Sequence, residues 1–265
     1  MWDTGPVPNA AHSTQRLPVL GVVQARMSSS RLPGKVLQPL GTRSVLAWVL
    51  RAAQAADELD EVVVATSVDS SDDALVEAIE QFGARVYRGP LTDVLGRFVG
   101  AVDEADRRSP GVPVAAVVRL TADCPLLDPD VIDLVVRTWR ASPELDHLTT
   151  TNPRCLPRGL DVEIVSRWAL ADVDSYAEGP DRVHVTSAVY RQPERYAVAG
   201  ICLHPDASDL RVTLDTEEDA RMLAALVPLL SSERPGWRQV VRVLREHPEI
   251  AELNAQVRQK ELSEG

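Results

Sequence analysis

Unbroken apolar runs alternate along the N-terminal half of the chain with segments whose apolar side chains recur at helical spacing. The runs lie at residues 17–23, 61–66 and 114–120, with a further short strand expected at 85–88, and the helical segments lie at 45–56, 72–82, 93–105 and 130–140. A strand without polar alternation is buried on both faces, and a helix after each strand supplies the crossover that parallel strands need. The pattern therefore predicts an α/β fold whose sheet is mostly parallel and covered by helices on both faces.

The rhythm changes after about residue 146. Shorter apolar segments separated by longer loops indicate further strands at residues 148–152, 160–165, 196–203 and 210–214, and helical spacing returns at 216–230 and 237–254. We expect a flexible leader over 1–16, a main domain over 17–230 with an inserted subregion at 146–205, and a C-terminal helical tail over 231–265. The predicted architecture is thus a Rossmann-like, doubly wound α/β sheet with one insertion.

Charge is distributed unevenly along the chain, whose 28 basic and 39 acidic residues give a net charge of −11. Residues 4–56 contain no acidic side chain, so the rest of the chain is strongly acidic and nucleic acid is not an expected partner. No apolar run reaches the ~18–20 residues of a membrane span, and no secretory segment opens the chain. Three scattered cysteines form no disulfide or zinc pattern. We expect a soluble, cytoplasmic protein without a membrane partner.

The loop at residues 24–35, QARMSSSRLPGK, follows the first predicted strand. In doubly wound sheets, ligands bind at the carboxyl ends of the strands. Three serines offer hydroxyls and accessible backbone N–H groups, Gly34 allows close approach, and Arg26, Arg31 and Lys35 bring three cations within ten positions. This composition suits a loop that wraps an oligophosphate, although the P-loop pattern is absent. A solvated basic loop is the alternative.

Two other strand ends carry a carboxylate toward the same edge of the sheet. Asp123 and Asp215 each follow a predicted strand directly. A carboxylate usually meets a polyphosphate through Mg²⁺, so the pair predicts a magnesium site for the phosphates held by the first loop. The alternative is helix capping, for which Asp128, and Thr216 with Asp219, are the better candidates.

These motifs are similar to those of the cytidylyltransferase family, which includes the spore-coat polysaccharide type and the CMP-KDO synthetases. The stretch 23–37, VQARMSSSRLPGKVL, resembles the family signature and is most similar to the spore-coat type. Similar segments follow in the same order at residues 63–67, 93–97, 118–126, 159–163, 184–186 and 214–219. The resemblance covers about residues 19–225 and implies a nucleotide-diphospho-sugar transferase-like fold.

The resemblance also implies an activity, that of a nucleotidyltransferase of the EC 2.7.7 class. Its substrates would be CTP, or another nucleoside triphosphate, and an anionic sugar-like, phosphate or phosphonate acceptor used in polysaccharide or natural-product biosynthesis. An acceptor oxygen would attack the α-phosphorus in line and pyrophosphate would leave, with Mg²⁺ as the cofactor. The family further implies a homodimer joined through the inserted subregion.

Site residues are carried over motif by motif. The catalytic residues would be Lys35, Arg26, Asp123 and Asp215, and the two aspartates would also hold the metal. The nucleotide would be bound by Ala25, Arg26, Ser29, Ser30, Arg31, Lys35, Thr66, Ser67, Arg119 and Thr121. The acceptor would be bound by Arg158, Asp161, Glu163 and His184.

Two positions depart from the family patterns. Ser28 stands where the spore-coat signature has glycine, which narrows the backbone freedom of the loop. Thr121 stands where the KDO-type enzymes have a glutamine near the base. The resemblance therefore supports nucleotidyl transfer more firmly than it supports a preference for cytosine.

The residues predicted to bind the acceptor can each be interpreted in two ways. Asp161 and Glu163 lie two residues apart, which places them on one face of a strand beside Arg158, where they could bind acceptor hydroxyls and an anionic group. A surface strand with solvated charges is the other interpretation. His184 either contacts the acceptor or organises the inserted region.

Two other functions are compatible with such a sheet. A nucleotide-sugar-dependent glycosyltransferase would share the metal-binding carboxylates, but it would lack the loop at 31–35 and would not release pyrophosphate. A non-catalytic nucleotide-binding protein would be expected to have lost Lys35 or one of the two aspartates, and all three are present.

Overall fold

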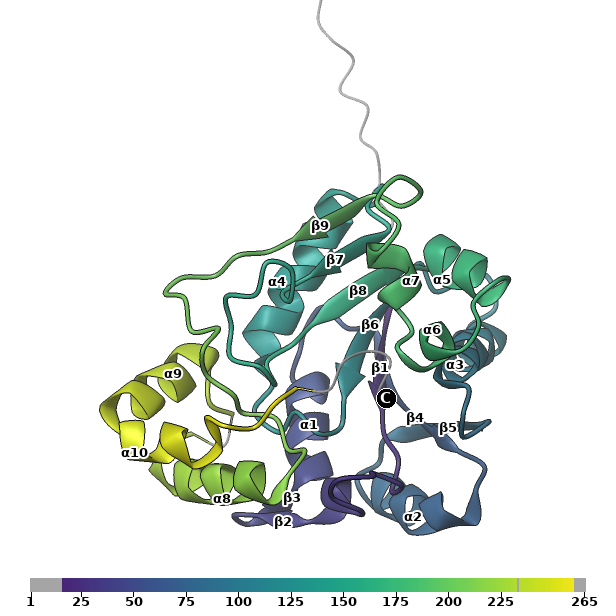
Figure 1. Ribbon diagram of the computed structural model, residues 1–265. Helices are drawn as coiled ribbons and strands as arrows, with labels where there is room; N and C mark the ends of the chain where they lie inside the picture. Colours follow the sequence, from purple (N-terminus) through teal and green to yellow (C-terminus); the bar gives the residue numbers. More distant parts are fainter. Residues whose placement is uncertain (1–15, 233, 260–265) are drawn as a thin grey trace, which may run out of the picture.

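A seven-stranded sheet forms the centre of the computed structural model, which describes residues 16–232 and 234–259 (Figure 1). Its strand order is β5-β4-β1-β6-β8-β7-β9. The strands are β1 (Val19–Gln24), β4 (Glu61–Ser67), β5 (Arg85–Gly89), β6 (Ala116–Thr121), β7 (His147–Thr149), β8 (Glu163–Ser166) and β9 (Val198–Gly200). All but the last residue of the expected leader at 1–16 lies outside the described residues.

The predicted mostly parallel α/β sheet is confirmed. β1 runs parallel to both β4 and β6, and β4 runs parallel to β5. β8 is antiparallel to its neighbours β6 and β7, and β9 pairs with β7 in parallel. A separate two-stranded hairpin joins β2 (Pro39–Leu40) to β3 (Arg43–Ser44). Because the chain leaves β1 toward β4 on one side and later returns to β6 on the other, the carboxyl end of β1 lies at a switch point of the sheet.

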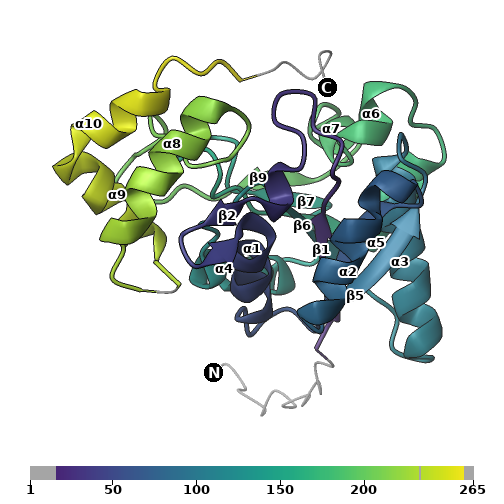
Figure 2. The ribbon, with the colours of Figure 1, turned by 90° about the horizontal axis from the view of Figure 1, so that it is seen from below.

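Helices cover both faces of the sheet, as the unbroken apolar strands require. Val19 and Val23 of β1 pack into one core and Leu20 and Val22 into the other. The first core includes residues of α1 (Val45–Gln54), α2 (Asp73–Gln81), α4 (Pro129–Ala141), α8 (Glu217–Leu226) and α9 (Trp237–Glu246). The second includes residues of α3 (Val94–Arg108), α5 (Arg167–Asp174) and α7 (Ser187–Tyr190). Figures 1 and 2 show α8, α9 and α10 (Pro248–Ala251) grouped at one end of the molecule.

Helix starts follow the predicted capping. The Asp128 carboxylate accepts hydrogen bonds from the backbone N–H groups of Asp130 and Trp237, so it caps α4 and also anchors the start of α9. Thr216 and Asp219 form a reciprocal capping box at α8. Asp123 and Asp215 take no part in these side-chain caps and are left for other contacts.

The later part of the chain departs from the sequence predictions. Residues 210–214 form no strand but only an isolated bridge between Arg158 and Arg211, because this segment passes beyond the end of β6, whose two edges are already paired. The expected helix at 216–230 ends at Leu226 and continues as a 3₁₀ turn. Three short helices, α5, α6 (Pro180–Val183) and α7, occupy a region predicted as loops, where Gly and Pro obscure the helical spacing. No helix of the described residues is both long and apolar enough to cross a membrane.

Candidate active site

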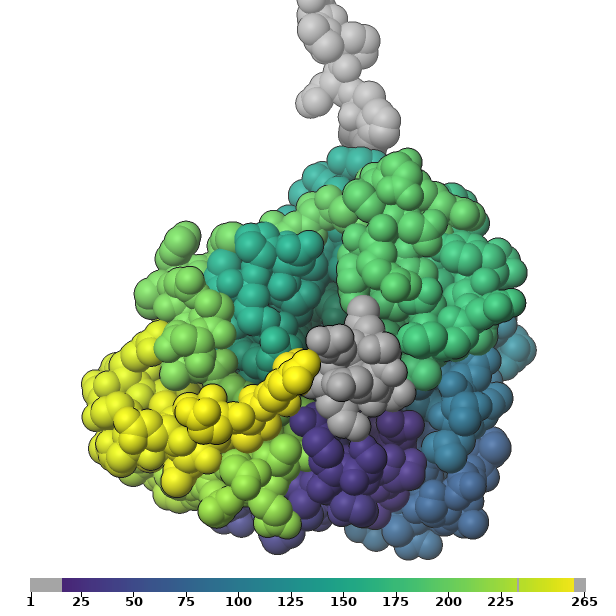
Figure 3. Space-filling view, in the orientation of Figure 1, coloured from purple at the N-terminus to yellow at the C-terminus, as the bar shows by residue number. Residues whose placement is uncertain are grey.

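A cavity of about 350 Å³ opens at the carboxyl ends of β1 and β6. Figure 3 shows the surface hollowed there, between the teal segment that follows β7 and the green helices α6 and α7. Most residues predicted for the site line this cavity: Ala25, Arg26, Ser29, Ser30, Arg31, Lys35, Arg119, Thr121, Asp123, Arg158, Asp161, Glu163, His184 and Asp215. Segments separated by up to 190 positions of the chain therefore meet in one hollow.

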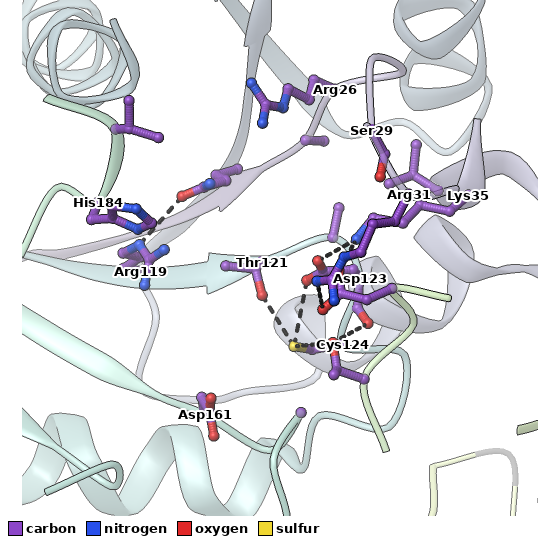
Figure 4. Close-up of a pocket in the computed structure, with 18 of the residues that line it drawn as sticks. Arg26, Ser29, Arg31, Lys35, Arg119, Thr121, Asp123, Cys124, Asp161 and His184 are labelled. Carbon is purple, nitrogen blue, oxygen red and sulfur yellow. Dashed lines mark hydrogen bonds and ion pairs between the residues drawn. The ribbon is translucent and has the colours of Figure 1, made fainter. Parts of the chain in front are cut away.

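Lys35 joins the two predicted carboxylates. Its Nζ lies 2.6 Å from Oδ2 of Asp123 and 2.7 Å from Oδ1 of Asp215 (Figure 4). The side chain of Lys35 is only 10% exposed, so these contacts are little screened by water. Burial alone would lower the pKa of the Lys35 ammonium, but the charges of Asp123 and Asp215 outweigh burial and raise it. Lys35 is therefore a fixed cation.

Asp123 and Asp215 are held side by side by backbone contacts. The N–H of Leu214 donates to the carbonyl of Asp123 at 2.8 Å, and the Thr213 hydroxyl donates to the same oxygen at 3.1 Å. Burial alone would raise the pKa of the Asp123 carboxyl, but Lys35 holds it below its usual range. The Asp123 carboxylate is thus an anionic acceptor, and the predicted pairing of Asp123 with Asp215 is present even though no strand precedes Asp215.

Asp215 also receives two arginines. Oδ2 of Asp215 lies 2.8 Å from Nη2 of Arg31 and 3.0 Å from Nη2 of Arg211. Arg211 is fixed in turn by Asp219 at 2.8 Å. Since Asp215 is shared among three cations, any one of them can turn to a phosphate without leaving the carboxylate unpaired.

The two carboxylates also fit a divalent metal ion. Mg²⁺ and Mn²⁺ prefer oxygen ligands and are commonly held by one or two carboxylates together with substrate phosphates. The described residues contain no cluster of three or more His, Cys, Asp or Glu side chains placed to hold a metal. Asp123 and Asp215 would therefore share the ion with the substrate.

Asp72, which the sequence placed only at a helix start, fixes the first loop. Its Oδ1 accepts the N–H of Met27 at 2.7 Å, while Oδ2 accepts the hydroxyl of Thr66 at 2.9 Å and the N–H of Ser67 at 3.1 Å. Thr66 and Ser67 are fully buried and do not line the cavity, so they act here as supports for Asp72. An aspartate at the first position of a predicted helix resembles an ordinary cap, which is why this role had no signal in the sequence.

Glu163, predicted to bind the acceptor, is buried in a network of polar side chains. Its carboxylate lies 2.9 Å from Nη1 of Arg119, 3.3 Å from Nε2 of His147 and 2.5 Å from the Thr186 hydroxyl. Burial alone would raise the pKa of Glu163, but Arg119, His147 and Thr186 lower it to about 2. The interpretation of a solvated surface strand is therefore wrong for Glu163, because the opposing β6 and β7 bury the face that it occupies.

Asp161 precedes β8 instead of lying within it, so the expected shared strand with Glu163 is wrong. Nη1 and Nη2 of Arg154 donate hydrogen bonds to Oδ1 and Oδ2 of Asp161, at 2.5 and 3.1 Å. Between the predicted acceptor residues Arg158 and Asp161, Gly159 has φ +104°, and a Cβ there would lie 2.5 Å from the backbone nitrogen of Thr213. Only glycine fits this contact, which brings the segment around Gly159 against the one that carries Asp215.

His184 lines the cavity from the end of α6, opposite the first loop (Figure 4). The next residue, Val185, is buried and has φ +48°, a left-handed conformation that a β-branched residue adopts only under constraint. The N–H of Thr186 donates back to the carbonyl of His184, and its side chain binds Glu163. This strained turn aims His184 into the cavity while Thr186 points to the buried network.

Nine lining residues had no predicted role, among them Arg97, Cys124 and Gln259. Cys124 lies 3.0 Å from the Thr121 hydroxyl, and burial, followed by the charges of Asp123 and Asp161, raises the pKa of its thiol well above the usual value. A protonated, buried thiol is a poor nucleophile, so Cys124 packs the site and does not act covalently. Arg97 lies in α3, where one polar side chain in an amphipathic helix gives no hint of a cavity.

Comparisons of the sequence and of the structure both relate this chain to cytidylyltransferases. The family model described as Cytidylyltransferase matches residues 20–261. The chain is 32% identical over 251 residues to the uncharacterized protein MJ1063 of Methanocaldococcus jannaschii, covering 93% of this chain and 98% of that protein. It is also 32% identical over 244 residues to the spore coat polysaccharide biosynthesis protein SpsF of Bacillus subtilis, covering 88% and 96%.

The solved structures that resemble this chain include a cytidylyltransferase and a CMP synthetase. A cytidylyltransferase from Leptospira borgpetersenii superposes with a TM-score of 0.81 at 27% identity, over 93% of this chain and 99% of that one. The structure of CMP:2-keto-3-deoxy-manno-octonic acid synthetase complexed with CTP gives a TM-score of 0.60 at 17% identity, over 80% and 99% of the two chains, and supports the fold alone.

Proposed function

Because this chain belongs to the cytidylyltransferase family and is a nucleotidyltransferase, we propose that it transfers CMP from CTP to an anionic sugar-like, phosphate or phosphonate acceptor and releases pyrophosphate. The observation that carries the proposal is the position of Lys35, whose Nζ touches both Asp123 and Asp215 beneath the serine- and arginine-containing loop. A compact cation, two oxygen donors for a metal and accessible backbone N–H groups are what transfer at a triphosphate requires.

The nucleotide is proposed to lie across the first loop. Arg26, Ser29 and Arg31 line the cavity and would bind triphosphate oxygens, with Lys35 on the pyrophosphate that leaves. Negative charge grows on the leaving group during transfer, and a lysine already fixed in the cavity stabilises that charge without reorganisation. Cytosine as the base is supported by the family description.

A divalent metal ion, which we propose is Mg²⁺, would be held by Asp123 and Asp215. When bound, it would neutralise phosphate charge and polarise the α-phosphorus toward attack. The chain's own contribution is to hold the two carboxylates side by side, through Lys35 and the hydrogen bond from Leu214 to Asp123.

The acceptor is proposed to lie against Arg158, Asp161 and His184, with Glu163 and its partners forming the wall behind. A carboxylate, phosphate or phosphonate is ionised at neutral pH, so its oxygen attacks without a strong general base. An anionic acceptor also matches Arg158, which forms no ion pair with the described part of the chain. The name of the Bacillus subtilis relative supports a sugar-like acceptor.

The functional test is a pyrophosphate-release screen that crosses four nucleoside triphosphates with a panel of anionic sugars, sugar phosphates and phosphonates. CTP with one acceptor class should release pyrophosphate and form a CMP adduct detectable by mass spectrometry. Release with another nucleotide would replace CTP in the proposal. Release of a nucleoside diphosphate from nucleotide sugars would instead indicate a glycosyltransferase.

We further propose a homodimer formed through residues 146–205. Helix α5 in this region exposes Trp168 to 57%, and Tyr176 just after it is exposed to 37%, which is unusual for large aromatic side chains. Light scattering should give twice the chain mass for the wild type and the chain mass for Trp168→Glu. A monomeric wild type would refute this assembly.

A further inference from the structure

We infer that Arg97, together with Arg26, forms an oxyanion subsite of the cavity, separate from the Lys35 cluster. The inference rests on the proposed function only in the identity of the ligand. Arg97 is 1% exposed, yet it lines the same cavity as Arg26. Its Nε is buried and has no hydrogen-bond partner among the described residues.

Within the part of the chain that the structure describes, Arg97 forms no ion pair, and the hydrogen bonds of its guanidinium go to backbone carbonyls. Burial, and then the nearby charge of Arg26, lowers the pKa of its guanidinium below the ordinary value. The nearby carboxylates of Asp72 and Asp93 are occupied elsewhere, because Asp72 binds the first loop and Asp93 binds Arg182 at 2.7 and 2.8 Å. A buried guanidinium without a partner carboxylate is costly to maintain, and an anionic ligand would remove that cost.

The position of Arg97 is built into the fold. Its Nη1 donates to the carbonyls of Pro90 and Leu91 at 2.7 and 2.9 Å, which orients the guanidinium. Gly89 leaves room for the side chain, because a Cβ there would lie 2.9 Å from Cγ of Arg97. Two backbone acceptors and a close glycine therefore hold the unpaired Nε in place.

The other cations of the cavity differ from these two arginines. Lys35 and Arg31 are paired with the aspartates, and Arg119 is paired with Glu163. Arg26 makes no ion pair or hydrogen bond with the described part of the chain, and Figure 4 shows it directed away from Lys35. Two adjacent unpaired guanidinium groups match the geometry of a phosphate-type or carboxylate oxyanion.

Two sources could supply this oxyanion, namely a phosphate of the nucleotide or the acid group of the acceptor. Calorimetric titration of CTP into the wild type and Arg97→Met, without acceptor, addresses the first. Titration of inorganic phosphate into each protein saturated with the α,β-methylene analogue of CTP addresses the second. Loss of a hydrogen-bonded charge pair should weaken the relevant binding by about tenfold to a hundredfold.

The two sources give different outcomes. Weaker CTP binding by Arg97→Met assigns the subsite to a nucleotide phosphate. Unchanged CTP binding with loss of phosphate binding to the saturated protein assigns it to the acceptor's anion. If neither titration changes, the subsite is refuted. If the wild type binds no CTP, the proposed function fails, and phosphate titrated into the free proteins still tests Arg97.

Matched controls separate binding from folding. Arg108→Met changes an arginine of the same helix that pairs with Glu61 and Glu104 outside the cavity, and it should leave both titrations unchanged. Arg97→Lys keeps the charge but loses the planar fork, so its affinity should fall between those of the wild type and Arg97→Met. Phosphate should raise the melting temperature of the wild type more than that of Arg97→Met.

Discussion

The ammonium of Lys35 lies 2.6 Å from the carboxylate of Asp123, although 88 residues separate them in the chain. Their contact spans the carboxyl ends of β1 and β6, which pair directly in the sheet. Because neighbouring parallel strands deliver the segments that follow them to one edge, a loop lysine and a loop aspartate become an ion pair.

Replacing Lys35 tests whether the shape of this cation matters. Lys35→Arg keeps the charge, but a planar fork cannot contact both Asp123 and Asp215 as one small donor does. We expect turnover to fall at least about tenfold, with a smaller change in the KM for CTP. Steady-state pyrophosphate release measures both quantities, and undiminished turnover would exclude Lys35 from the chemistry.

Replacing either carboxylate tests the metal assignment. Asp123→Asn and Asp215→Asn each remove one oxygen anion, so we expect pyrophosphate release to fall about a hundredfold or more. Circular dichroism should show an unchanged fold. EDTA should abolish wild-type activity and added Mg²⁺ should restore it. Wild-type rates in either variant would contradict the assignment.

Replacing Asp72 tests the support of the first loop. Asp72→Ala frees the N–H of Met27 and leaves Thr66 and Ser67 unpaired, so we expect a loss of about 3 kcal/mol in the free energy of unfolding. Urea denaturation measures this loss. The KM for CTP should rise as the loop loosens, whereas Asp69→Ala, at an exposed aspartate outside the cavity, serves as the control. If Asp72→Ala were as stable as the wild type and had the same KM for CTP, the first loop would not depend on Asp72 for its position.

Glu163 should make stability depend on pH in the acid range. Its pKa is lowered from 4.5 to about 2, so its contribution is complete above pH 4.5 and is lost as the pH falls through about 2. The shift corresponds to about 3 kcal/mol. Denaturation from pH 6 to pH 2 should show the difference between wild type and Glu163→Gln shrinking by that amount. The exposed Glu144→Gln should show no such trend.

The arrangement of the site was more predictable than its local structure. The alternation of buried strands and helices predicted a parallel sheet, and hence that the loops after its strands share one edge. Asp215 was expected beside Asp123 at the end of a strand. It lies there because single hydrogen bonds from Leu214 and Thr213 attach this segment to Asp123, and such contacts leave no periodic pattern in a sequence.

The contacts of Arg97 and Asp72 in the site could not be predicted from the sequence. Each is buried by residues distant in the chain, and each looks like an ordinary helix residue in a local window. Glu163 was identified as a site residue, but its burial depends on pairing between β8 and two antiparallel neighbours. Polar side chains whose environment is set by tertiary pairing cannot be separated from solvated ones by spacing alone.

The contact of Gly159 with Thr213 has a consequence for how this enzyme can change. It ties the wall proposed for the acceptor to the strand-like segment that ends in Asp215, and hydrogen bonds between Arg158 and the residues Leu210 and Val212 reinforce the tie. A mutation that reshapes this wall for a new acceptor will also displace Asp215. Acceptor choice and catalytic rate are thus inherited together, and selection for a different substrate has to preserve this junction or rebuild both sides of it.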